Sequence, residues 1–208
     1  MAAWSAFYPW VKPLVPACPD PYLDRALCDA AIEFCETTQA FQERVSLKVK
    51  ANVATYPLTS SEGSPGMVLG VTLGNERTVY PVYVDALTNV YGEQWKDQTG
   101  DPVMYLADDE DTLHLYPIPL NDDTGKMTLA LRPNRSDTDW DDRLYERYGE
   151  IIANGALSRL LLQTGTLWAD MVGGAYRKKV FVQGMSKVRA KVQASITPAG
   201  IYPRFDFY

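Results

Sequence analysis

The hydrophobic pattern of this chain changes its period twice, and that change restricts the folds open to it. In residues 20–38, apolar residues recur at the helical spacing i, i+3, i+4, i+7. From Val45 to Val53 they alternate with polar residues, as in a half-buried strand. Helical spacing returns after Asp139. The pattern predicts a helix, then a β segment, then more helix, in a chain of 208 residues that is long enough to bury a sizeable core.

The β segment contains several short apolar runs separated by turn residues. Beyond the first run, strands are predicted at 67–73, 78–84, 103–107, 112–116 and 126–132. Pro81 lies inside the second of these and predicts an edge strand or a bulge, because proline cannot donate to a ladder. A short helix is predicted near Asp85 to Tyr91. Residues 43–135 are therefore predicted to form an inserted all-β sandwich or barrel domain.

The helical segments each have one apolar face and suitable ends. Asp20 and Pro21 favour a helix start, and Asp142 places negative charge at the start of the next helix. Residues 20–40 and 139–193 are predicted to form a small bundle of one N-terminal and two C-terminal helices, the latter at 142–164 and 169–193. The predicted fold class is α+β: a helical bundle with an inserted β domain.

Both ends of the chain are rich in proline and aromatic residues. Residues 1–19 are predicted to be an extended N-terminal arm, and residues 194–208 a C-terminal arm. Aromatic side chains give large contact area at low entropy cost, so partner contact is expected, although folding back onto the chain's own domain stays open. The candidate partner-binding residues are Trp4, Phe7, Tyr8, Trp10, Tyr202, Phe205, Phe207 and Tyr208.

Charge is unevenly distributed along the chain. The net charge of −6 and pI near 4.8 argue against a general nucleic-acid binder but leave room for a local basic surface. Residues 101–150 contain thirteen acids and five Lys or Arg, whereas residues 171–205 contain no acid. The C-terminal helix thus predicts a basic surface facing a neighbouring subunit or a DNA channel, with a solvated helix face as the alternative. Its cations are Arg177, Lys178, Lys179, Lys187, Arg189 and Lys191.

The stretch LADDEDTLHLYPIP, residues 106–119, holds four consecutive acids and the single histidine, His114. The spacing fails the EF-hand template, and one histidine cannot make a zinc site. The stretch instead predicts a hairpin with the acids at its tip and His114 on a strand surface or interface. A candidate inter-subunit acidic tip consists of Asp108, Asp109, Glu110 and Asp111.

Motifs that carry catalysis are missing from the sequence. It contains no GxSxG, Walker A or GxGxxG. The three cysteines (Cys18, Cys28 and Cys35) lack CxxC spacing and are expected to be buried, reduced thiols. No signal peptide or membrane-spanning stretch is expected, so synthesis in a cytoplasm is predicted. We expect no catalytic residues, no metal, no cofactor and no enzymatic activity.

Many weak landmarks occur in a characteristic order. They are Trp95, Gly100-Asp101-Pro102, Tyr105, Leu113-x-Leu115-Tyr116-Pro117-Ile118-Pro119, Leu131-Arg132-Pro133, Tyr148-x-x-Ile151-x-x-Gly155-Ala156-Leu157-x-x-Leu160, Trp168 and Phe181-x-x-Gly184-Met185. Together with the early helix DRALCDAAIEFCETT, this series resembles the head-to-tail adaptor, or connector, proteins of tailed bacteriophages. The resemblance covers roughly residues 15–192.

The resemblance implies a structural role in the virion neck. Such adaptors form a ring, usually of twelve copies, below the portal; they connect capsid to tail and help to retain the genome. It implies a homo-oligomer, a portal protein and a tail or nozzle protein as partners, non-specific contact with DNA in the channel, and no membrane. The alternative is a non-viral binding module whose β domain recognises a protein or a carbohydrate.

Overall fold

The computed structural model describes residues 2–74, 76–107, 109, 111–137 and 139–196. These fall into two compact units, which we describe separately. The β unit comprises residues 41–141, and the helical unit comprises residues 2–40 together with the chain from Asp142 onward. The predicted α+β class is confirmed.

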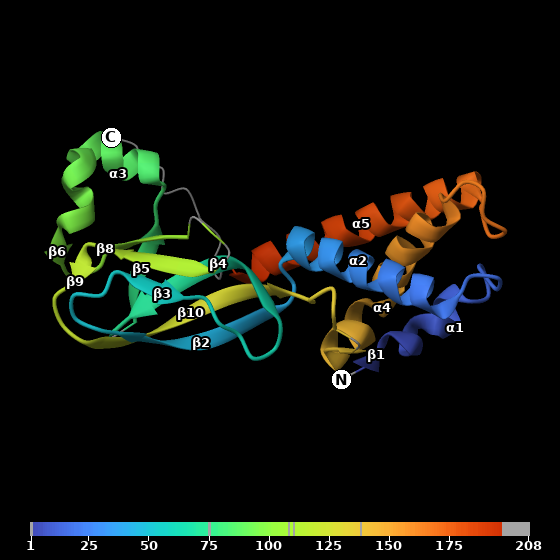
Figure 1. Cartoon of the computed structure of the whole chain (residues 1–208), viewed down its shortest axis with the longest axis horizontal. Helices are drawn as coiled ribbons and strands as arrows, with labels where there is room; N and C mark the ends of the chain where they lie inside the picture. Colours follow the sequence, from blue (N-terminus) through green and yellow to red (C-terminus); the bar gives the residue numbers. More distant parts are fainter. Residues whose placement is uncertain (1, 75, 108, 110, 138, 197–208) are drawn as a thin grey trace, which may run out of the picture. The chain divides into compact units, whose positions relative to one another are not determined.

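The helical unit contains the three predicted long helices (Figure 1). They are α2 (Asp20–Thr38), α4 (Asp142–Leu161) and α5 (Met171–Ile196), preceded by β1 (Ala2–Ala3), the 3₁₀ helix η1 (Trp4–Phe7) and α1 (Tyr8–Val11). Helix α2 begins at the predicted Asp20-Pro21 pair and ends at Thr38, because the next residue, Gln39, has a left-handed φ of 53° that turns the chain. Helix α4 is three residues shorter at its end than predicted, and α5 begins two residues later.

A glycine allows the long helices to approach closely. A Cβ atom built on Gly155 of α4 would lie 2.8 Å from the Phe181 ring of α5 and 3.0 Å from the Cβ atom of Ala30 of α2. Phe181 and Ala30 are both buried. Gly155 therefore marks the point where α4 meets both of its neighbours, and no larger residue fits there without displacing one of them.

We predict that Gly155→Ala destabilises the helical unit by about 1 kcal/mol, the difference between the middle of the overpacking range and the gain in helix propensity. The added methyl group overpacks the junction, at a cost of about 1–3 kcal/mol, and the gain in helix propensity of about 1 kcal/mol offsets it only in part. Chemical denaturation followed by circular dichroism measures the difference. Gln183→Ala, at an exposed position of α5, is the control and should be nearly neutral. Unchanged or increased stability of Gly155→Ala would contradict the packing described.

The β unit is built on one curled mixed sheet that forms a half-barrel (Figure 1). Its strand order is β2-β10-β4-β5-β7-β8-β3. The strands are β2 (Gln42–Val49), β3 (Thr55–Pro57), β4 (Ser64–Leu73), β5 (Arg77–Pro81), β7 (Met104–Leu106), β8 (Thr112–Tyr116) and β10 (Asp123–Arg132). Two further strands, β6 (Thr99–Gly100) and β9 (Ile118–Pro119), form a separate parallel pair. The last strand of the unit is β11 (Asp139–Trp140). The described strands thus form a single large, half-barrel sheet, where a sandwich or barrel was predicted.

Strand β5 is an inner strand, so the expectation that Pro81 marks an edge strand or a bulge is wrong. β5 pairs antiparallel with β4 through Arg77 to Val79, and parallel with β7 through Tyr80 and Pro81. Pro81 is the last residue of the strand, where its missing N–H leaves the ladder intact. The N–H of the next residue, Val82, resumes the pairing by donating to the carbonyl of Tyr105 at 2.9 Å.

Helix α3 (Val84–Tyr91) and the 3₁₀ helix η2 (Gly92–Asp97) build a second small core in this unit. Leu87 of α3 packs with Leu106 and Tyr116, all at most 3% exposed. Trp95 meets the Tyr116 ring edge-on at 5.9 Å. Both faces of β8 are consequently covered. Tyr116 packs into this small core on one face, and Leu113 and Leu115 are buried on the other.

Candidate interaction surfaces

The N-terminal residues pack against their own unit. Residues 4–11 form η1 and α1 in place of the predicted extended arm, and the prolines do not prevent it because Pro9 falls in the first turn of α1. Trp4 is 4% and Phe7 is 0% exposed, so the structure uses both for the core of the helical unit. Because Trp4 and Phe7 are buried, partner contact remains a prediction only for the N-terminal side chains that are still accessible.

Two of the predicted N-terminal contact residues keep accessible surface. Trp10 stacks on Tyr145 of α4 at 5.3 Å and is still 40% exposed. Tyr8 is half-buried, and its hydroxyl donates a hydrogen bond of 2.8 Å to Asp24. Burial and this bonded carboxylate raise the pKa of the Tyr8 phenol. Trp10 is therefore the N-terminal aromatic best placed to meet a partner.

Gly149 of α4 provides the space that Trp10 occupies. A Cβ atom there would lie 2.5 Å from the Trp10 ring. We predict that Gly149→Leu displaces the N-terminal segment and speeds its proteolytic cleavage about tenfold, because local opening is favoured by about 1.4 kcal/mol. Limited proteolysis with mass spectrometry gives the rate. Glu146→Leu, an exposed position of the same helix, is the control; equal cleavage of both variants and the parent would show that α4 does not hold this segment.

The C-terminal contact residues predicted from the sequence, Tyr202, Phe205, Phe207 and Tyr208, lie outside the described residues. Their contact with a partner stays a prediction.

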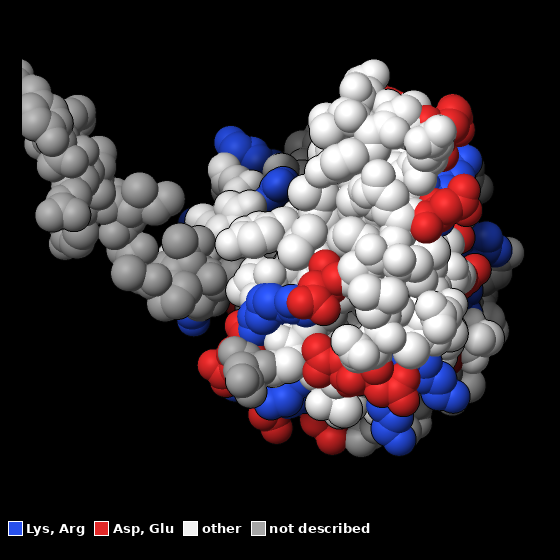
Figure 2. Space-filling view, turned by 90° about the vertical axis from the view of Figure 1, so that its left-hand side faces the viewer, with Lys and Arg blue, Asp and Glu red and all other residues white. Residues whose placement is uncertain are grey.

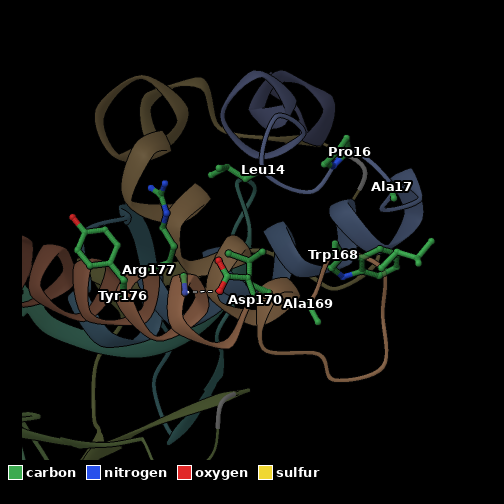
Figure 3. Close-up of a pocket in the computed structure, with 11 residues that line it drawn as sticks. Leu14, Pro16, Ala17, Trp168, Ala169, Asp170, Tyr176 and Arg177 are labelled. Carbon is green, nitrogen blue, oxygen red and sulfur yellow. Dashed lines mark hydrogen bonds between the residues drawn. The ribbon is translucent and has the colours of Figure 1, made fainter.

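A pocket of about 370 Å³ opens beside the turn between α4 and α5 (Figure 3). Leu14 and Pro16 come from the N-terminal segment, and Trp168, Asp170 and Tyr176 from the turn and the start of α5. Asp170 accepts a hydrogen bond of 3.0 Å from the N–H of Gly173, drawn as a dashed line in Figure 3, which caps α5. The start of α5 beside this pocket is thus already capped by a side chain of the same protein.

Much of the rim of this pocket is apolar. Leu14, Leu167 and Tyr176 are 45%, 92% and 62% exposed. The indole N–H of Trp168 is buried without an acceptor among the described residues, and it has no accessible surface that a ligand in the pocket could reach. The exposed apolar side chains therefore suit an apolar segment of a partner.

Five basic residues of α5 are exposed. Lys178, Lys179, Lys187, Arg189 and Lys191 are spread around the helix, with Lys178 and Arg189 beside the buried residues Phe181, Met185 and Val188. Arg177 differs: it is half-buried and donates to the Asn154 side chain of α4 at 2.8 Å. The structure therefore brings five of the six predicted cations to an accessible surface and assigns Arg177 to packing.

The acidic turn, residues 108–111, connects β7 and β8 in the predicted hairpin. Asp108 and Glu110 lie outside the described residues; Asp109 and Asp111 are exposed. The carboxylate of Asp109 accepts hydrogen bonds from the hydroxyl and N–H of Thr112 and from the N–H of Asp111. These bonds hold the pKa of Asp109 below its usual range and tie its side chain to Asp111 and Thr112.

His114 is a strand residue in this hairpin. Its ring nitrogens lie 2.9 Å from the Thr55 hydroxyl of β3 and 3.4 Å from the Thr112 hydroxyl. It is half-buried, which agrees with the predicted position on a strand surface. Among the described residues, no group of three or more His, Cys, Asp or Glu side chains is arranged to hold a metal ion.

The outer face of β2, β10, β4 and β5 carries a polar surface that the sequence did not predict. We call it the basic sheet face; it borders a hollow of about 750 Å³. Strand register places Lys126 of β10 between Ser46 of β2 and Thr72 of β4, with Thr78 of β5 next in the row. The neighbouring rows bring Arg44 opposite Thr128 and Lys48 opposite Thr124. The signal was the regular alternation of these residues with apolar ones, but alternation does not reveal which strands pair.

A largely uncharged surface covers the side of the β unit that carries α3. Figure 2 shows few charged side chains over its upper part, with acids and bases gathered below. Exposed apolar residues in and beside α3 include Tyr83 at 85%, Val90 at 71% and Tyr91 at 42%. Exposed apolar residues gathered in this way are typical of contact surfaces.

The remaining predicted features concern thiols and membranes. Cys18, Cys28 and Cys35 are buried and unbridged, as predicted. Burial raises the pKa of the Cys35 thiol, which disfavours the reactive thiolate. In the part of the chain that the structure describes, no helix combines the length and apolarity needed to cross a membrane.

Fold and surfaces together define an α+β protein of two units with separate basic, acidic and apolar surface regions. The family model described as SU10 adaptor protein matches residues 9–199, which include nearly all of both units. The chain therefore belongs to the SU10 adaptor protein family. This membership makes it a phage structural protein of the adaptor type and a component of the virion. Among curated proteins, no match to the chain was found.

Proposed function

We propose that this protein is a head-to-tail adaptor that forms a ring, expected to be dodecameric, below the portal in the virion neck. The ring connects capsid to tail and helps to retain and pass the DNA. The observation that carries the proposal is the match to the adaptor family over residues 9–199, since it covers the helical and the β unit alike. The protein is assigned a structural role without catalysis, cofactor or metal.

The distribution of surface types supports a ring. Like copies in a ring meet through two different surfaces, so complementary regions must occur on one chain. This chain has a basic helix, α5, and an acidic turn at residues 108–111. It also has exposed apolar residues on both units, such as Tyr83 and Leu167, which suit contacts with the portal or tail protein.

The accessible aromatic groups at the ends support partner contact. Trp10 is exposed enough to meet a neighbour, and the pocket beside Trp168 has exposed apolar side chains, such as Leu14 and Leu167, for an incoming segment. Portal, tail or nozzle proteins are the proposed partners of these sites.

Composition of purified particles tests the function. Quantitative mass spectrometry should find the protein in a fixed ratio to the portal protein, about one to one for twelve copies of each. Imaging of the neck should place it between portal and tail. A protein that is absent from particles, and stays monomeric when mixed with portal protein, would overturn the proposal.

Salt titration decides whether α5 faces DNA. If its exposed cations contact phosphates, Lys187→Gln with Lys191→Gln should lower the slope of log affinity against log salt by about 1.8, since each phosphate contact contributes about 0.9. Binding of the assembled protein to duplex DNA gives the slope. Lys96→Gln, an exposed cation of the β unit, should leave it unchanged. An unaltered slope in the double variant assigns α5 to protein contacts instead.

A further inference from the structure

The basic sheet face concentrates positive charge in a chain that is acidic overall. Arg44, Lys48 and Lys126 line its hollow together with one carboxylate, Glu76. All three cations are exposed. Because the whole chain carries a net charge of −6, this local excess of positive charge points to an anionic ligand.

The backbone of four paired strands holds the donors of this face in fixed rows. Lys126 is flanked by Ser46 and Thr72; the Thr72 hydroxyl donates to the Lys126 carbonyl at 3.3 Å, so Ser46 is the flanking residue whose hydroxyl remains to donate to a ligand. In the neighbouring row, Gly70 lies opposite Thr128, which in turn lies opposite Arg44, and an added Cβ atom on Gly70 would meet nothing within 4 Å. The missing side chain leaves open space beside Thr128 for a carboxylate, whose charge Arg44 and Lys126 complement.

The chemistry of the lining favours an acidic peptide over nucleic acid. Among the described residues, no aromatic side chain lines the hollow, whereas surfaces for single strands rely on stacking bases against aromatic rings. Three cations opposed by Glu76 are few for duplex DNA, whose binding depends on many phosphate contacts. Ser and Thr hydroxyls beside Lys and Arg suit the carboxylates of a short, exposed turn.

We propose that the basic sheet face of one copy binds the exposed acids of the acidic turn, Asp109 and Asp111, of a neighbouring copy. The N–H groups of Asp111 and Thr112 already donate to the Asp109 carboxylate before contact, which holds these residues together. Little conformational entropy is therefore lost on binding. This inference rests on the proposed function in one respect, since it needs copies that assemble.

Strand register explains why the turn must come from another copy. β7 runs parallel to β5, with Met104 opposite Tyr80, so the turn after Leu106 lies beyond the Pro81 end of β5. Thr78 of the basic sheet face is near the other end, roughly 16 Å away along the strands at about 3.3 Å per residue. Turn and face thus occupy different places on one unit. A contact between them on successive copies is heterologous, which is the kind that closes into a ring.

Zero-length cross-linking tests the contact directly. A carbodiimide joins a lysine amine to a carboxylate only when the two touch. In assembled protein, prepared from equal amounts of ¹⁵N-labelled and unlabelled full-length chains, Lys126 or Lys48 should be joined to residues 108–111 in mixed-isotope pairs. Cross-links from these lysines to other acids only, or in same-isotope pairs only, would overturn the inference.

A charge exchange provides the second test. Lys126→Glu alone and Asp111→Lys alone should each raise the protein concentration needed for half-maximal assembly about tenfold. The double variant, in which the charges are exchanged, should return to within about threefold of the parent. Lys96→Glu is the control and should assemble like the parent. Circular dichroism verifies that each variant is folded. Double-variant assembly no better than that of the singles would refute the contact.

The outcomes separate this inference from the proposed function. If the protein is a neck component and assembles, but the cross-links and the rescue both fail, only the contact is wrong. If the protein is missing from particles and stays monomeric with portal protein, the proposed function itself is wrong. If Lys48→Glu and Lys126→Glu weaken duplex DNA binding while no cross-link to residues 108–111 forms, the face is a nucleic-acid surface and the inference is overturned.

Discussion

The pairing of β10 with two strands far from it in sequence is the constraint on which the β unit depends. β10 lies between β2 and β4 and is hydrogen-bonded to both along most of its length. β2 is the first strand of the sheet along the chain and β10 is the last. Since Gln42 lies opposite Ala130, the chain enters and leaves the sheet through neighbouring strands. A segment of about one hundred residues, 41–141, can therefore interrupt a helical chain between α2 and α4 without separating the helices it joins.

Local pattern was enough to predict the helices, the acidic hairpin and the buried cysteines. Each depends on residues that are near one another in sequence: the Asp20-Pro21 start of α2, for instance, or the alternation around Leu113 and Leu115. The N-terminal segment shows the limit of such reasoning. Its prolines predicted an extended arm, but Pro9 is compatible with a helix start, and the apolar surface of α4 at Tyr145 and Gly149 decides the outcome.

Pairing between distant strands is what the sequence could not provide. The sequence shows the residues of the basic sheet face as polar positions in strand-like runs. That they form one surface depends on which strands lie next to one another. Lys126 lies next to Ser46 and Thr72, which are 80 and 54 residues away in the chain. The prediction made from Pro81 was wrong for the same reason, since the effect of this proline depends on where β5 stops pairing with β4 and starts pairing with β7. Side-chain alternation fixes which face a residue takes, but not its neighbours on that face.

Charge separation within one acidic chain has a consequence for assembly. The exposed acids Asp109 and Asp111 attract the exposed cations on the sheet and on α5 of another copy, while the net charge of −6 makes copies repel one another at long range. Salt screens the long-range repulsion more than it weakens close contacts between complementary groups. Orientation then matters more than proximity: two copies gain energy only when unlike surfaces meet, and like surfaces repel. In the proposed ring, the acidic turn of one copy would meet a basic surface of the next, a heterologous contact that can repeat from copy to copy.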